Sequence, residues 1–178
     1  MKKTIILLLT VIITANAYSQ EDEGISKGDN EVTFHGFVFT SVGTDSKHAF
    51  GNLFLSYGKY YTDKLLLGLA PGISISTTNT AEGTEVNSDW SGQLFANYNF
   101  SVVKKGFPYV KGSYYQSTFD IPDGASFRDY GSLQIGLGYK SFFNEFASID
   151  TSLNYGKSLA EGAEGGSLML MTGLSFIF

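Results

Sequence analysis

The 178-residue chain contains no cysteine. Disulfide bonds, thiol catalysis, cysteine-based metal sites and the acylated cysteine of a lipoprotein are therefore excluded. Only three prolines are present, and charged residues make up 16% of the chain, so most of its polar character comes from uncharged side chains. The formal net charge is −5 and no basic cluster occurs, which argues against nucleic-acid binding.

Long apolar runs are also scarce, and the one that stands out lies at the N-terminus. Lys2 and Lys3 precede an apolar stretch at residues 5–13, and small residues follow, an order typical of a secretory signal peptide. The stretch is too short to cross a bilayer as a helix, which takes about 20 residues. Cleavage after Ala17 and cleavage after Ser19 both fit, and we expect a signal peptide over residues 1–19.

The rest of the chain divides into a short arm and one domain. Residues 20–30 are acidic, contain glycine and have almost no apolar side chain, so we expect a flexible periplasmic arm. Residues 31–178 are the length of one domain. The chain has 21 glycines, 11 tyrosines and 15 phenylalanines, which favours strands separated by turns over helices.

Eight segments alternate with a period of two. Leu65, Leu67 and Leu69 alternate with Gly68 and Ala70, for example, and four of the segments show this contrast clearly. The fifth segment is ambiguous, because Lys111 lies on the same face as Phe107, Tyr109, Tyr115 and Phe119. The eight predicted strands cover residues 31–42, 49–60, 65–77, 88–100, 107–119, 129–141, 146–157 and 167–178.

The predicted connections alternate in length. Those after the second, fourth and sixth strands are short (61–64, 101–106, 142–145), and those after the third, fifth and seventh are longer and polar (78–87, 120–128, 158–166). This asymmetry and the alternation of apolar and polar faces are typical of outer-membrane barrels. A closed barrel also pairs every backbone amide within the lipid. We predict an all-β fold, an eight-stranded antiparallel up-and-down transmembrane β-barrel with both termini in the periplasm.

Aromatic residues gather near the predicted turns, where the membrane meets water. Tyrosine and tryptophan suit such interfaces, because one end of each side chain is apolar and the other polar. Core aromatics of a soluble β-sandwich are the alternative interpretation. We expect Tyr57, Tyr60, Tyr61, Tyr98, Phe100, Phe107, Tyr109, Tyr139, Phe142, Phe143 and Phe146 at the periplasmic rim, and Trp90, Phe119, Phe127 and Tyr130 at the outer rim.

The last strand carries a recognisable pattern, with Gly173, Leu174, Phe176 and the terminal Phe178. It resembles the C-terminal signal read by the barrel-assembly machinery, and residues 31–178 resemble the OmpA-type eight-stranded outer-membrane β-barrel domain family. Tyr18-Ser19-Gln20 resembles the signal-peptide ends of Bacteroidota. The resemblance implies a Gram-negative outer membrane, contact with lipid and lipopolysaccharide, and insertion by the assembly machinery. The parity of the strands further predicts that the eighth strand closes against the first near Val32 and Phe34.

The lumen of an eight-stranded barrel is only wide enough for side chains, so we expect no open solute pore. Lys140 and Asp150 flank the turn at 142–145 on the inward parity, and we expect them to form a lumenal salt bridge with a structural role. The predicted polar plug consists of His35, Gln93, Asn97, Gln134, Lys140 and Asp150, with Asn52, Asn99, Gln116 and Asn154 as further lumen candidates.

No catalytic, cofactor or metal site is predicted. Asp45, Ser46 and His48 are the nearest approach to a catalytic group, but a solvated loop explains them as well. His35 has no second metal ligand nearby, and the acidic loops lack the spacing of a calcium loop. We expect a monomeric, non-enzymatic outer-membrane protein with a structural or surface-contact role, because a closed barrel leaves no unpaired edge. The alternatives are a membrane-embedded lipid-modifying enzyme and a soluble periplasmic ligand-binding barrel.

Overall fold

The computed structural model describes residues 25–40, 48–80, 83–100 and 105–178. The predicted signal peptide, the first part of the predicted arm and the loop residues Asp45 and Ser46 lie outside these ranges. Among the described residues, no helix is long and apolar enough to cross a membrane.

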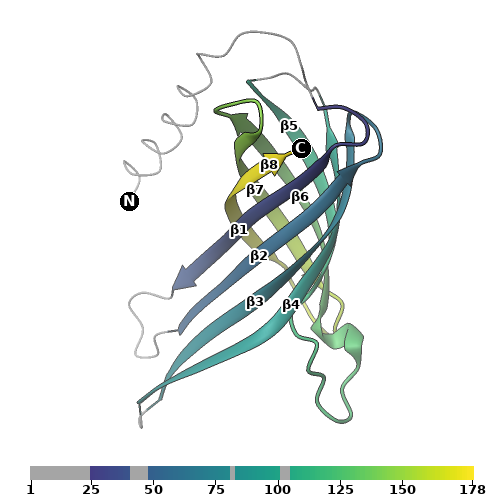
Figure 1. The fold of residues 1–178 in the computed structure, drawn as a ribbon. Helices are drawn as coiled ribbons and strands as arrows, with labels where there is room; N and C mark the ends of the chain where they lie inside the picture. The colour runs from purple at the N-terminus through teal and green to yellow at the C-terminus, as the bar shows by residue number, and fades with distance from the viewer. Residues whose placement is uncertain (1–24, 41–47, 81–82, 101–104) are drawn as a thin grey trace.

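Eight antiparallel strands form one closed barrel, as predicted, in which each strand pairs with the next and the last pairs with the first (Figure 1). A single-turn 3-10 helix, η1, spans Phe127–Tyr130 before the sixth strand. The strands are β1 (Asn30–Thr40), β2 (His48–Tyr60), β3 (Leu65–Thr80), β4 (Gly83–Asn99), β5 (Gly106–Gln116), β6 (Gly131–Phe142), β7 (Ala147–Ser158) and β8 (Ser167–Ile177).

The register that closes the barrel agrees with the predicted parity. Val32 of β1 lies opposite Phe176 of β8, and Phe34 lies opposite Leu174. The backbones of Asn30 and Phe178 exchange two further hydrogen bonds, of 2.8 and 3.0 Å. The C-terminus therefore lies at the end of the barrel that carries the 61–64 and 143–146 connections, which we call the turn end. The opposite end is called the loop end.

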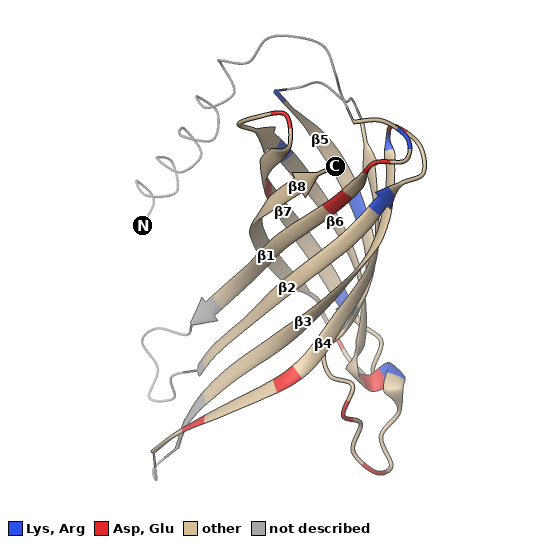
Figure 2. Ribbon diagram, in the orientation of Figure 1, with Lys and Arg blue, Asp and Glu red and all other residues tan. Residues whose placement is uncertain are grey.

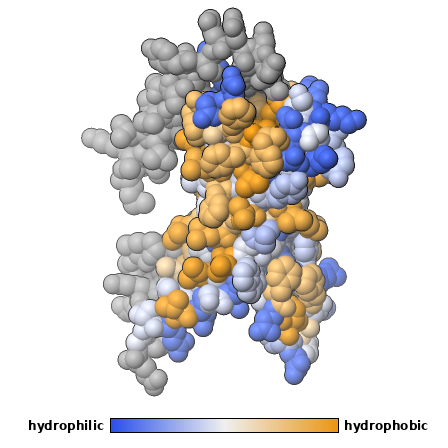
Figure 3. All heavy atoms as spheres, viewed as in Figure 1, coloured by the Kyte–Doolittle hydropathy of each residue, from blue (hydrophilic) through white to orange (hydrophobic). Residues whose placement is uncertain are grey.

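The two faces of the barrel wall differ in chemistry. On the face seen in Figure 3, apolar residues extend as a belt across the middle of the molecule and hydrophilic residues lie toward the two ends. Most charged residues also lie toward the two ends (Figure 2). Exposing a large apolar side chain to water costs about 1.5–3 kcal/mol, so such a belt is suited to lipid. Outward-facing exposed residues of the belt include Phe34, Leu53, Leu55, Leu67, Leu69, Ile73, Leu94, Leu133, Ile135, Leu137, Leu153, Leu168, Leu170 and Leu174.

The hairpin of β3 and β4 is longer than the sequence pattern predicted. Residues 78–87 were expected to form a loop, which is wrong, because β3 runs to Thr80 and β4 begins at Gly83. Threonine and valine favour strands even where both faces are wet, and here they pair across the hairpin, with Thr77 opposite Val86. Pairing between β4 and β5 ends much earlier, at Gly92 and Gln116, so the outer part of the hairpin extends past β5 (Figure 1).

Strand β5 turns its aromatic face inward. Phe107, Tyr109 and Lys111 are all buried, because a lysine in the middle of a strand cannot face lipid and its two aromatic neighbours share its face. The expectation that all the turn-end aromatics lie at the lipid interface is therefore wrong for Phe107 and Tyr109, and also for Tyr60 and Phe142, which are buried at this end. The other seven turn-end aromatics are exposed, as are Trp90, Phe119 and Phe127 at the loop end.

Residues 25–30, the second part of the predicted arm, contact the turn end of the barrel. The Gly28 N–H donates to the carbonyl of Tyr60 at 2.8 Å. The Lys27 N–H donates to Asp63 Oδ1 at 2.9 Å. Ile25 packs against both clusters of buried apolar side chains. This part of the chain is thus bonded to the barrel, and β1 begins one residue before the predicted domain boundary.

Candidate functional site in the barrel lumen

An ionic cluster lies inside the barrel near the turn end. Lys140, whose side chain is 0% exposed, donates from Nζ to Glu31 Oε1, and the same Nζ lies 3.2 Å from Asp150 Oδ2. Lys140 and Asp150 are direct cross-strand partners, so the expected ion pair is present. Glu31 was not predicted as a partner, yet it is the second anion of the cluster.

Two buried tyrosines complete the hydrogen bonding of these carboxylates. The Tyr60 hydroxyl donates to Glu31 Oε2 at 2.8 Å, and the Tyr109 hydroxyl donates to Asp150 Oδ1 at 2.5 Å. Thr33 Oγ1 donates to Glu31 Oε1 at 3.1 Å. A buried charge is tolerated only when it is paired and hydrogen-bonded, and both carboxylates meet that condition.

A second layer of polar side chains lies further along the lumen. Lys111 Nζ donates to Gln93 Oε1 at 2.9 Å, and Gln93 Nε2 donates to Gln134 Oε1 at 3.0 Å and to Ser113 Oγ at 2.9 Å. Lys111 also lies over the Phe95 ring, 5.0 Å from its centroid. The structure therefore brings the predicted plug residues Gln93 and Gln134 into direct contact, and adds Lys111, whose role was not predicted, as a donor to Gln93.

A third layer lies nearer the loop end. The Asn52 Nδ2 amide donates to the Tyr115 hydroxyl at 3.0 Å, and that hydroxyl is 3.2 Å from Ser74 Oγ. Ser74 Oγ also donates to the carbonyl of Ser117, just past the end of β5, at 3.3 Å. Hydrogen-bonded side chains therefore occur at three successive levels across the barrel interior.

Glycines on the inward face make room for these side chains. The Tyr109 ring occupies the space that a side chain at Gly138 would fill, and the Phe95 ring does the same at Gly68. In a barrel of only eight strands, large lumenal residues must lie opposite small ones. The high glycine content of the chain is thus explained in part by lumen packing.

The remaining lumen candidates are His35, four asparagines and Gln116. His35 stacks on Phe54 with ring centroids 5.2 Å apart, and both His35 and Asn97 line a cavity of about 20 Å³ next to Glu31, enough for one water molecule. Asn52, Asn99 and Asn154 are buried, as expected of lumenal residues. Gln116 was expected in the lumen, which is wrong, because it shares the outward parity of Tyr114 and is buried beneath the segment that follows β5.

The residues missed by the sequence analysis are Glu31, Tyr60, Tyr109 and Lys111. The available signal was the mid-strand lysine, whose charge should have outweighed the aromatic residues in assigning the faces of β5. Glu31 was detectable through the closing register, which puts it on the inward parity one residue before Val32.

The described residues of the lumen provide hydrogen-bonding groups, the ammonium groups of Lys111 and Lys140, and the carboxylates of Glu31 and Asp150. Among them, no group of three or more His, Asp or Glu side chains is arranged to hold a metal ion. The candidate loop residues Asp45 and Ser46 lie outside the described ranges, as does the side chain of His48.

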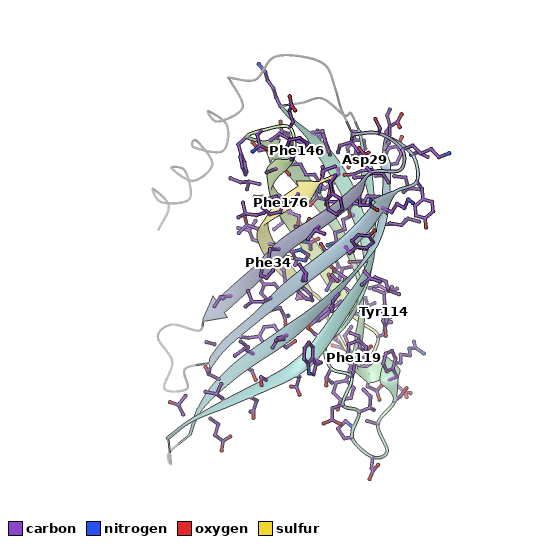
Figure 4. All side chains as sticks on the ribbon, in the orientation of Figure 1. Asp29, Phe34, Tyr114, Phe119, Phe146 and Phe176 are labelled. Carbon is purple, nitrogen blue, oxygen red and sulfur yellow. The ribbon has the colours of Figure 1, made fainter. Side chains whose placement is uncertain are left out.

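The residues of the predicted insertion signal lie at the turn end of β8. Leu174, Phe176 and Phe178 face outward and are 46%, 48% and 65% exposed. Gly173 faces inward against the backbone of Phe34 and His35, where a Cβ atom would be too close. Figure 4 shows Phe176 near Phe34 on the neighbouring strand. Recognition of this pattern by an assembly machinery stays a prediction.

Comparison with known proteins supports the fold. No family model matches the chain, and no curated protein matches it. The N-terminal β-barrel domain of OprF from Pseudomonas aeruginosa is similar in structure, with a TM-score of 0.59 and 21% identity over 88% of this chain and 100% of that domain. The outer-membrane protein OprG from the same organism has a TM-score of 0.52 and 17% identity over 89% of this chain and 99% of its own. The chain therefore has the fold of an eight-stranded outer-membrane β-barrel.

Proposed function

We propose that the protein is an integral outer-membrane barrel without enzymatic activity, and that its lumen is closed by its own side chains. The observation that carries this proposal is the three-level hydrogen-bonded interior, anchored by Lys140 between Glu31 and Asp150. Two cavities between these levels of the described interior have volumes of about 20 and 10 Å³. A hydrated solute would have to break the ion pairs to pass.

In this proposal the barrel acts through its lipid-facing outer wall and its loop end, and not through its interior. The apolar belt binds lipid, and the connections at the loop end face outward, where they contact lipopolysaccharide or other surface molecules. A monomer satisfies this role, because β1 and β8 pair with each other and need no second chain.

Liposome swelling tests the closed lumen. Vesicles containing the purified protein are expected to swell in an isotonic arabinose solution no faster than vesicles without protein, with a general porin as the positive control. Swelling at a rate close to that of the porin would refute the proposal of a closed lumen.

The absence of lipid-modifying activity has its own test. Deleting the gene is expected to leave the mass spectrum of lipid A unchanged. Loss or gain of an acyl chain in the deletion strain, restored by the intact gene, would assign an enzymatic role instead.

A further inference from the structure

An apolar groove opens on the outer surface where β4 and β5 separate. Their pairing ends at Gly92 and Gln116, and beyond this point β4 continues with β3 while the chain after β5 turns away. The groove has a volume of about 720 Å³, within the range of about 300–1,000 Å³ found for small-molecule sites. Its walls include Leu69, Trp90, Leu94, Tyr114, Phe119 and Phe127.

One wall of the groove is the segment that follows β5, which is fixed by the hydrogen bonds of Gln116. Gln116 is 2% exposed, and its Nε2 donates to the carbonyls of Thr118 at 2.9 Å and Phe127 at 3.1 Å, while its Oε1 accepts from the Tyr114 hydroxyl at 2.6 Å. These bonds fix the segment that carries Phe119 and Phe127, whose ring centroids are 6.3 Å apart. Phe119 belongs to this segment, and its ring lies beside β4 (Figure 4).

The floor of the groove is Gly92, which leaves the space between the walls empty. A Cβ atom at this position would lie 2.9 Å from Cζ of Phe119, so a larger side chain would fill the floor and press on the wall. Gly112 is the matched outward glycine of β5, because a Cβ atom there meets nothing within 4 Å and the residue is not part of the groove.

The chemistry of the groove selects its occupant. The hydrogen-bonding groups of Gln116 are already engaged, so the groove offers apolar carbon to a ligand and little else. Leu69 and Leu94 belong to the lipid-facing belt, so the groove is continuous with the surface that contacts acyl chains, and Trp90 suits the membrane interface at its outer end. We propose that this groove is a binding site for one acyl chain of a membrane lipid.

Photolabelling in vesicles tests this proposal, which rests on the membrane placement proposed above. The protein is reconstituted into phosphatidylcholine vesicles containing a few per cent of phosphatidylcholine with a diazirine on one acyl chain, irradiated, and mapped by mass spectrometry. We expect more label at Phe119 and Phe127 than at the belt residues Leu153 and Leu170. Equal labelling at all four positions would overturn the proposal.

Variants at the two glycines separate a specific site from general lipid contact. In Gly92→Leu the groove label is expected to fall about tenfold, equivalent to about 1.4 kcal/mol of binding. In Gly112→Leu it is expected to stay unchanged, and the label at Leu153 should be constant in both. An unchanged groove label in Gly92→Leu would refute the site.

A folding check and a second photoprobe complete the experiment. Folding of each variant is checked by its heat-dependent mobility on a gel, and if Gly92→Leu does not fold, Phe127→Ala removes one wall and is expected to give the same loss. Groove labelling by a free diazirine fatty acid but not by the phospholipid would refute a membrane lipid as the occupant. Absence of label at Leu153 and Leu170 as well would instead overturn the membrane placement.

Discussion

Lys140 is fully buried between two carboxylates in the interior of the barrel. Its ammonium group lies on β6, Asp150 on the adjacent β7, and Glu31 on β1, which lies beyond β8 in the barrel order. The cluster therefore connects strands that are not neighbours. Removing one member of such a group leaves a buried charge without its partner, which is far more costly than the net benefit of the pair.

Lys140→Met keeps most of the side-chain volume and removes the charge. We expect a loss of about 3–5 kcal/mol in the free energy of unfolding, because Glu31 and Asp150 would then face each other without a cation. Urea unfolding in lipid vesicles, followed by gel mobility, measures this loss. Lys64→Met, in the exposed 61–64 turn, is the control and is expected to change stability by no more than about 0.5 kcal/mol. Equal stability of the two variants would contradict the role given to Lys140.

Gly138 is required for space rather than for backbone conformation. Gly138→Leu is expected to displace the Tyr109 ring from above the glycine and to lower stability by about 1–3 kcal/mol. The same unfolding measurement applies. Gly112→Leu, on the outward face with open space around it, should behave like the unmodified protein, and a similar loss in both variants would show that lumen packing is not the cause.

Lumen residues were predicted correctly in strands whose apolar and polar faces alternate clearly. The prediction failed in β5, where aromatic residues occur on both faces. Lys140 and Asp150 were paired correctly because both lie on strands with clean alternation. Lys111 was left unassigned, because aromatic residues suit both a lipid interface and a crowded lumen and so carry no information about direction. Long-range partners such as Glu31 and Lys140 could not be paired, because the alternation within one strand does not tell which side chains meet across a barrel.

At the scale of the strands, the hairpin of β3 and β4 is the main departure from a uniform barrel. These strands have 16 and 17 residues, whereas crossing a bilayer takes about 9–11. The hairpin was mistaken for a loop because its residues are polar on both faces, which removes the alternation that identifies a half-buried strand. A strand that projects into water is expected to be polar on both faces, because water contacts both of them.

The protruding hairpin gives a test of orientation. Because the chain lacks cysteine, Glu85→Cys in the hairpin and Glu145→Cys in the β6–β7 turn each introduce a single thiol. In intact cells, a membrane-impermeant maleimide is expected to label Glu85→Cys and not Glu145→Cys, and both after the outer membrane is permeabilised. The reverse pattern would mean that the loop end faces the periplasm.

At the scale of the whole molecule, apolar side chains face outward and polar side chains face inward, a distribution typical of outer-membrane barrels. Pairing of Glu31–Gly36 in β1 with Thr172–Ile177 in β8 closes the barrel, and many of the polar groups that fill the interior are hydrogen-bonded to one another. This arrangement was predictable from the sequence, because the strand count, the alternation and the connection lengths agree. The groove between β4 and β5 was not, since it depends on where pairing stops.

Membrane fractionation combined with gel mobility tests the central claim most directly. After cell lysis and a carbonate wash, the protein is expected to stay in the outer-membrane pellet and to migrate faster on a gel when it is not boiled, as a closed barrel does. Recovery in the soluble periplasmic fraction, with the same mobility before and after boiling, would contradict the account.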